Sequence, residues 1–239
     1  MKTFLTTLLF LVSTFYANAQ QDEFYKNVDH IMRNYVKHGM VNYSALKSDP
    51  SELNKIVEQI KNTDLKTLSN DEFVAFVINA YNMLVIYNVV NHYPMEGPLK
   101  VKGFFTDKSF SIGNIKLSLD DLEKKILFGK SKDSRLHFAL SCAAVGCPPL
   151  SNTVYKPKTV DNQLKEQAKI SINNTQFIRI DRTKKEVQLS QIFEWYSLHF
   201  GSSKKEQIAY LNKYLEEPIT NDYKVKYYTY NWDLNDWIE

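Results

Sequence analysis

The segment His137–Leu150, HFALSCAAVGCPPL, holds both cysteines of the chain and a histidine close to them. A thiolate is the reactive form of cysteine, and a nearby protonated histidine lowers the thiol pKa enough to populate the thiolate near neutral pH. His137 and Cys142 would lie on opposite faces of a strand, and about 140° apart around a helix. A strand that ends in a turn at Ser141 would still bring them together. This segment is therefore the first candidate for a catalytic site.

Three other interpretations of the same segment stay open. A free cysteine is often a small buried apolar residue, and His137 stands between two apolar residues, as a hydrogen-bonded core histidine would. Cys142 and Cys147 could also form a disulfide, if the geometry of the short loop permits it. Their C-x4-C spacing differs from the C-x-x-C of thioredoxin-type oxidoreductases, which disfavours an enzyme of that type.

The element that would position this segment is an apolar helix. Ser69 and Glu72 form a capping box, and the residues after it, Phe73–Val90, are apolar almost all round. Asn79 and Asn82 fall on one face of this helix. Buried amides need hydrogen-bond partners, so the two asparagines either pin an adjacent loop or orient a catalytic histidine. Such amides also favour a core helix over a membrane span.

The remaining pattern predicts further helices and short strands. Helices are expected over residues 22–38, 49–61, 118–129, 159–172, 190–200 and 204–215. Strands are expected as a hairpin within 104–117, as a pair over 176–180 and 186–189, and over 224–232. No βαβ rhythm is sustained, so the pattern predicts an α+β fold. We expect a mostly helical single domain with a buried central helix and a small antiparallel sheet or hairpins.

Other candidates for chemistry are weaker. No histidine pair has the spacing of metal ligands and no glycine-rich phosphate loop is present, so neither a metal nor a cofactor is expected. Two aromatic clusters could stack on a sugar or peptide, but such clusters more often form core. They are Tyr228, Tyr230 and Trp232, and Phe193, Trp195 and Tyr196.

Residues 1–19 have the features of a signal peptide: Lys2, an apolar run, and Ala17-Asn18-Ala19 as the cleavage pattern. We therefore expect a secreted or periplasmic protein with one domain over 20–239. The formal net charge is +3, and the lysines alternate with acids, as in Asp121-Leu-Glu-Lys-Lys, which is typical of a solvated surface. Without a basic stripe, nucleic-acid binding is not expected. A small-molecule or peptide ligand is expected, the pattern predicts no stable membrane span, and the oligomeric state is left open.

Several motifs resemble the signature of the domain-of-unknown-function 547 family. They are Phe76-Val-Ile-Asn-Ala-Tyr-Asn82, Arg135-Leu-His-Phe-Ala-Leu-Ser-Cys142, Cys147-Pro-Pro-Leu150, Ile192-Phe-Glu-Trp-Tyr196 and Tyr230-Asn-Trp232. The resemblance covers nearly the whole chain after residue 19 and implies a single domain. It implies no mechanism, because the family has no assigned activity.

The leading hypothesis is a thiol-dependent hydrolase or acyl-transfer enzyme acting on a peptide or amide. In it, Cys142 is the nucleophile, His137 the base, and Asn79 the orienting or oxyanion-stabilising amide. The residues expected to bind substrate are Asn82, Tyr81 and Cys147. The alternative is a non-catalytic extracellular ligand-binding module in which Cys142 and Cys147 shape a structural loop.

Overall fold

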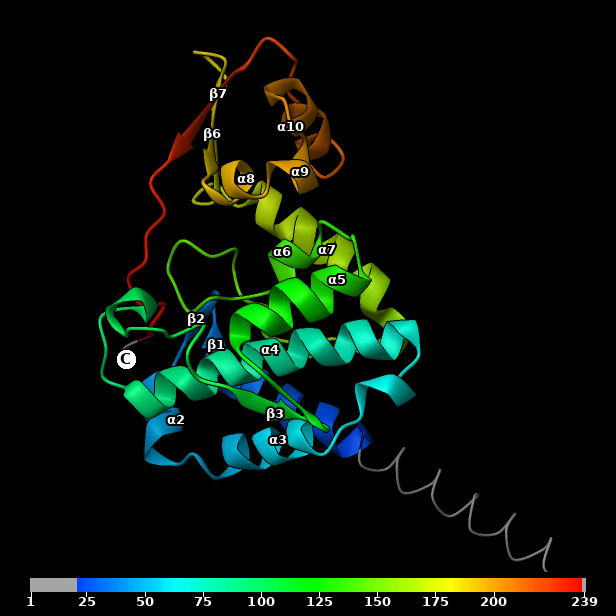
Figure 1. Ribbon diagram of the computed structural model, residues 1–239. Helices are drawn as coiled ribbons and strands as arrows, with labels where there is room; N and C mark the ends of the chain where they lie inside the picture. Colours follow the sequence, from blue (N-terminus) through cyan, green and yellow to red (C-terminus); the bar gives the residue numbers. More distant parts are fainter. Residues whose placement is uncertain (1–20, 238–239) are drawn as a thin grey trace, which may run out of the picture.

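The computed structural model describes residues 21–237. The expected signal peptide, residues 1–19, lies outside these residues. Figure 1 shows two parts of the molecule: a helical part built around the long helix α4 (Asn70–His92), and a second part in which a small sheet packs against short helices. The α+β class expected from the sequence is confirmed.

Helix α4 is the centre of the first part. Its capping box is formed as predicted, because the Glu72 carboxylate accepts hydrogen bonds from the Ser69 backbone N–H at 2.8 Å and from its hydroxyl at 2.7 Å. The helix is long and apolar enough to cross a membrane, but 89% of its apolar window is buried inside the protein. It is a core helix, surrounded by residues from most elements of the first part.

The chain before α4 forms a helix over residues 21–35 and then short elements. These are β1 (Val36–Lys37), β2 (Met40–Val41), α2 (Tyr43–Ser48), α3 (Ser51–Lys61) and η1 (Leu65–Thr67). The first helix was expected to reach residue 38 but ends earlier. The reason is that His38 and Gly39 both have positive φ, which turns the chain so that β1 pairs with β2.

After α4 come η2 (Pro98–Lys100) and a hairpin of β3 (Phe110–Ile112) and β4 (Ile115–Leu117). The hairpin expected within residues 104–117 is present, and it turns at Gly113-Asn114. The helix predicted over 118–129 is present, but its middle is a π-helix, η3 (Asp121–Leu127), which continues into α5 (Phe128–Lys130). π-Helical turns are rare and occur frequently at functional sites.

The second part follows a connecting region. It contains α6 (Leu136–Ala139), η4 (Pro157–Thr159), α7 (Val160–Asn173), β5 (Ile178–Asp181), β6 (Glu186–Ser190), α8 (Ile192–Trp195), α9 (Ser197–Phe200), α10 (Lys204–Leu211) and β7 (Lys224–Tyr228). Strands β5 and β6 pair antiparallel as predicted, whereas β7 pairs with β6 in parallel, so the sheet is mixed. The helix predicted over 190–200 is divided at Tyr196 into α8 and α9.

Two hydrophobic clusters form the core of residues 21–237. One surrounds α4, and the other lies between the mixed sheet and α7 to α10. Beyond β7 the chain becomes irregular, and residues 230–237, which we call the C-terminal strap, run back toward the first part (Figure 1, red). The strap and the segment after α6 lie side by side where the two clusters meet.

Candidate active site

The two cysteines lie together on the loop that follows α6. We call residues 140–147 the Cys loop. The Cys142 and Cys147 sulfurs are free thiols 2.6 Å apart, and the Tyr230 hydroxyl lies 3.0 Å from the first and 3.1 Å from the second. The Cys142 backbone N–H also donates to the Cys147 sulfur, at 3.1 Å. Cys147 is therefore surrounded by hydrogen-bond donors.

These donors shift the pKa values of the two thiols in opposite directions. Burial raises the pKa of Cys147, but hydrogen bonds from the Cys142 thiol, the Tyr230 hydroxyl and backbone N–H groups outweigh it and lower that pKa to about 7. The pKa of Cys142 is raised, first by burial and then by the hydrogen bond and negative charge of Cys147. The pair thus favours a Cys147 thiolate that is hydrogen-bonded by a Cys142 thiol.

Two asparagines of α4 pin the chain around the Cys loop. The Asn82 side chain donates to the Ala139 carbonyl at 2.9 Å and accepts from the Ser141 N–H at 2.9 Å. Asn79 donates to the Tyr155 carbonyl at 2.7 Å and accepts from the N–H of the same residue at 3.1 Å. Both amides use their donor and acceptor on backbone groups. Such bonds fit the interpretation in which the two asparagines pin an adjacent loop. The catalytic role expected for Asn79 stays a prediction.

The C-terminal strap holds the other side of the Cys loop. The Val145 N–H donates to the Asp233 carbonyl at 2.9 Å, and the Gly146 N–H donates to the Asn231 carbonyl at 2.8 Å. The two backbones approach so closely that a Cβ at position 146 would lie 2.9 Å from the Asn231 nitrogen and oxygen. Gly146 is therefore required by close contact. The loop backbone is held on one side by the Asn82 side chain and on the other by the backbone of the strap.

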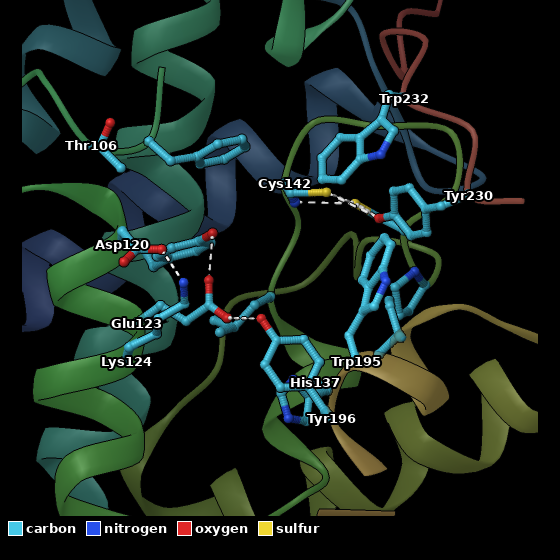
Figure 2. A pocket seen from close by; sticks show the side chains of 16 residues that line it. Thr106, Asp120, Glu123, Lys124, His137, Cys142, Trp195, Tyr196, Tyr230 and Trp232 are labelled. Atoms are coloured by element: carbon cyan, nitrogen blue, oxygen red, sulfur yellow. Dashed lines mark hydrogen bonds and ion pairs between the residues drawn. The ribbon is translucent and has the colours of Figure 1, made fainter. Parts of the chain in front are cut away.

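A cavity of about 400 Å³ opens beside the two sulfurs. Figure 2 shows Asp120, Glu123 and Lys124 on one side of it and aromatic rings on the other, with Cys142 between them. The predicted residues that line it are Tyr81, His137, Cys142 and Cys147. Asn79 and Asn82 lie behind this surface, where they are fully buried. The central helix, the Cys loop, η3, α8 and the strap thus all contribute to one pocket.

His137 lies in the pocket wall but is not hydrogen-bonded to a sulfur. Its Nε2 lies 2.7 Å from Nδ1 of His199, and its ring packs on Tyr196 and Phe128. Burial, and next the proximity of His199, lower the pKa of His137 to about 3, so the ring is neutral at ordinary pH. Among the described residues, no histidine forms a hydrogen bond with either cysteine sulfur. The role of His137 as a base stays a prediction.

The Asp121-Leu-Glu-Lys-Lys pattern predicts a solvated charged surface, and for Glu123 this prediction is wrong. The carboxylate turns into the pocket, where it accepts hydrogen bonds from the Tyr81 hydroxyl at 3.0 Å and the Tyr196 hydroxyl at 3.3 Å. Burial raises the pKa of Glu123. A signal for this residue was present, because Glu123 stands four positions after Leu119 and next to Leu122, in the apolar stripe of the helix.

The aromatic residues considered as a stacking surface are divided between pocket and core. Three of them, Trp195, Tyr230 and Trp232, line the pocket. The ring centroid of Tyr230 lies 4.7 Å from that of Trp232 and 5.2 Å from that of Trp195, and the two tryptophan centroids are 6.1 Å apart. Tyr228 lies outside this pocket, and its hydroxyl donates to the Phe177 carbonyl. The strand predicted over 224–232 ends at residue 228, so the two later aromatics belong to the strap.

Metal ligation has no support in the part of the chain that the structure describes, where no group of three or more His, Cys, Asp or Glu side chains could hold an ion. The pocket instead offers the two sulfurs, the Glu123 carboxyl and several aromatic side chains, among them Trp195, Tyr230 and Trp232.

Comparison with known proteins gives a family match only. Residues 65–170 match the family described as "Protein of unknown function, DUF547". The matched range contains the long helix, the π-helix and the Cys loop, and it ends before the mixed sheet and the strap. No curated protein and no solved structure matches the chain.

Proposed function

We propose a function from the pocket itself, because the DUF547 family that residues 65–170 match has a description that names no activity: Cys142 and Cys147 form a dithiol centre for thiol–disulfide exchange. The substrate is a small-molecule or peptide disulfide that binds in the pocket. The observation that carries the proposal is the pair of free sulfurs 2.6 Å apart beside an open cavity.

The reaction needs only the two thiols and the substrate. The Cys147 thiolate attacks one sulfur of the substrate disulfide, a Cys147–substrate bond forms, the substrate S–S bond breaks, and the first leaving thiolate takes up a proton. Cys142 then loses its proton and attacks the Cys147 sulfur. The internal disulfide forms and the second substrate thiol leaves, so the substrate gains the two electrons that the dithiol loses. A second thiol–disulfide couple reverses the change and restores the dithiol.

The arrangement suits these steps. Thiolate formation at Cys147 is favoured by three donors, and Cys142 is in contact with the sulfur that it must attack. A disulfide requires the sulfurs to be about 2.05 Å apart, so their present separation leaves little movement. The hydrolase expected from the sequence needs an imidazole beside the thiol, whereas His137 is hydrogen-bonded to His199. That hydrolase stays a prediction, and exchange has the better geometric support.

The test is to trap the two steps separately with glutathione disulfide. Wild-type protein is expected to release two equivalents of glutathione and to finish with an internal disulfide. Cys142→Ser should stop at a mixed disulfide on Cys147, seen as an added glutathione mass. Cys147→Ser should react far more slowly, because the remaining thiol has a raised pKa.

Circular dichroism of both serine variants controls for folding. The proposal fails if the two variants react at equal rates, or if wild-type protein accumulates a stable mixed disulfide. It also fails if the native protein has no free thiol after mild reduction, which would favour the non-catalytic ligand-binding module.

A further inference from the structure

The pocket has two chemically different walls. The aromatic wall consists of Trp195, Tyr230 and Trp232, whose rings contact one another. Trp195 lies at the pocket mouth with 47% of its surface exposed, although it is a large apolar residue. Faces of tryptophan and tyrosine carry partial negative charge and attract cations. An aromatic wall that remains open to solvent is a surface available for a ligand.

The opposite wall carries more acidic than basic side chains, with Asp120 and Glu123 against Lys124. Lys124 is the basic residue of this wall, and its ammonium group is 2.5 Å from the Asp120 carboxylate, with which it is paired. Glu123 makes no ion pair with any basic side chain of the described chain; its partners are the two phenol hydroxyls of Tyr81 and Tyr196. His137 in the same pocket is neutral and supplies no counter-charge.

Burial raises the pKa of Glu123 and so favours its neutral form, whereas a cation beside the carboxylate favours the charged form. Hydroxyl donors hold the Glu123 oxygens in place but do not neutralise them. A ligand cation between Glu123 and the aromatic wall would supply the missing charge and would also contact the ring faces. An anionic ligand would meet Asp120, Glu123 and the Cys147 thiolate, and a purely apolar ligand would leave the carboxylate without a counter-charge.

We infer that this pocket binds ligands through an ammonium or guanidinium group, with Glu123 as the counter-ion and Trp195, Tyr230 and Trp232 as the aromatic wall. The inference names the substrate class of the site and rests on the proposed function only for the step that follows binding. The binding itself does not involve the thiols, so the two proposals can fail separately.

The experiment measures binding of three probes of equal chain length: n-butylammonium, n-butanol and n-butyrate. Titrations follow tryptophan fluorescence and are repeated by calorimetry, with the full chain in which both cysteines are replaced by serine. We expect n-butylammonium to bind at least roughly tenfold more tightly than the other two probes.

Glu123→Gln should remove most of this preference, because the amide keeps the shape of the side chain and loses its charge. Glu194→Gln is the matched control, since Glu194 is an exposed carboxylate next to Trp195 that does not line the pocket. It should retain the preference. Trp195→Leu, at the exposed mouth, provides a second variant that does not disturb the buried tyrosines, and it should weaken n-butylammonium binding.

Three outcomes would overturn the inference. They are equal binding of n-butanol and n-butylammonium, unchanged n-butylammonium affinity in folded Glu123→Gln protein, and no binding of any probe. None of them bears on whether Cys147 forms a mixed disulfide, which is measured with the thiols present.

Discussion

At the scale of single residues, the Tyr230 hydroxyl is a hydrogen-bond partner that both thiols share. It lies within 3.1 Å of both sulfurs and comes from a segment far along the chain. A donor to a thiolate stabilises the charged form and lowers its pKa. Because the thiolate is the nucleophile, this hydroxyl should control the pH range in which Cys147 reacts.

We expect the rate of Cys147 alkylation by iodoacetamide to rise through about pH 7 and then level off, as the thiolate becomes fully populated. Tyr230→Phe should move this midpoint to higher pH and slow alkylation at neutral pH. Tyr228→Phe is the control, because its hydroxyl donates to a backbone carbonyl away from the sulfurs. Mass spectrometry of the alkylated peptide identifies the reacting cysteine. An identical midpoint in Tyr230→Phe and wild type would contradict the expectation.

Spacing along the chain places the two thiols and His137 in one neighbourhood, and all three line the same pocket. Spacing does not identify the partners of these groups. These partners, Glu123, His199 and Tyr230, all lie at least 14 positions outside the segment His137–Leu150. Hydrogen bonds between residues so far apart leave no local spacing pattern in the sequence. Their types were visible in the sequence, whereas their contacts depend on how the two parts of the fold pack.

At the scale of elements, α4 both forms the core and fixes the Cys loop. Its capping box, length and burial followed from local pattern, and so did the shared face of Asn79 and Asn82. The bonding partners of these amides could not be predicted, since they are backbone groups 57 to 76 positions away. The π-helical turns of η3 could not be predicted either. A π-helical turn changes the direction in which side chains point, but it requires no particular residue types that a sequence pattern would reveal.

Asn82→Ala should lower the free energy of unfolding by about 2–4 kcal/mol, because it leaves a buried carbonyl and a buried N–H without partners. Asn91→Ala on the same helix is the control, since that amide is exposed and bonds only to the carbonyl one turn earlier. Its effect should stay within about 0.5 kcal/mol. Urea unfolding measures both. Equal losses in the two variants would show that Asn82 does not pin the Cys loop.

At the scale of the whole molecule, the pocket is formed between two hydrophobic clusters and closed by the C-terminal strap. The alternating pattern of residues 224–228 predicted a strand, but alternation is the same for parallel and antiparallel pairing, so the direction of β7 was not encoded locally. The same pattern was extended to residue 232, where the chain instead leaves the sheet to meet the Cys loop.

Gly146→Ala tests the contact between the strap and the loop. The added methyl group would lie 2.9 Å from backbone atoms of Asn231, so the strap must move, at a cost of about 1–3 kcal/mol in unfolding free energy. Gly129→Ala is the control, because its nearest neighbour would be a carbonyl oxygen at 3.9 Å. Within a helix this change is expected to be neutral or to stabilise by up to about 1 kcal/mol. Urea unfolding of the two variants distinguishes the cases, and similar behaviour would contradict a close contact at Gly146.

The contact between the strap and the Cys loop joins residues that are synthesised at different times. A ribosome delivers the Cys loop first, and Tyr230 follows Cys147 only 83 positions later. Until that tyrosine has docked, the Cys147 sulfur lacks one of its donors, and the nascent cysteines should behave more like ordinary, unactivated thiols. The Cys147 thiol therefore acquires its full set of donors only after Tyr230 has been synthesised and has docked against the Cys loop.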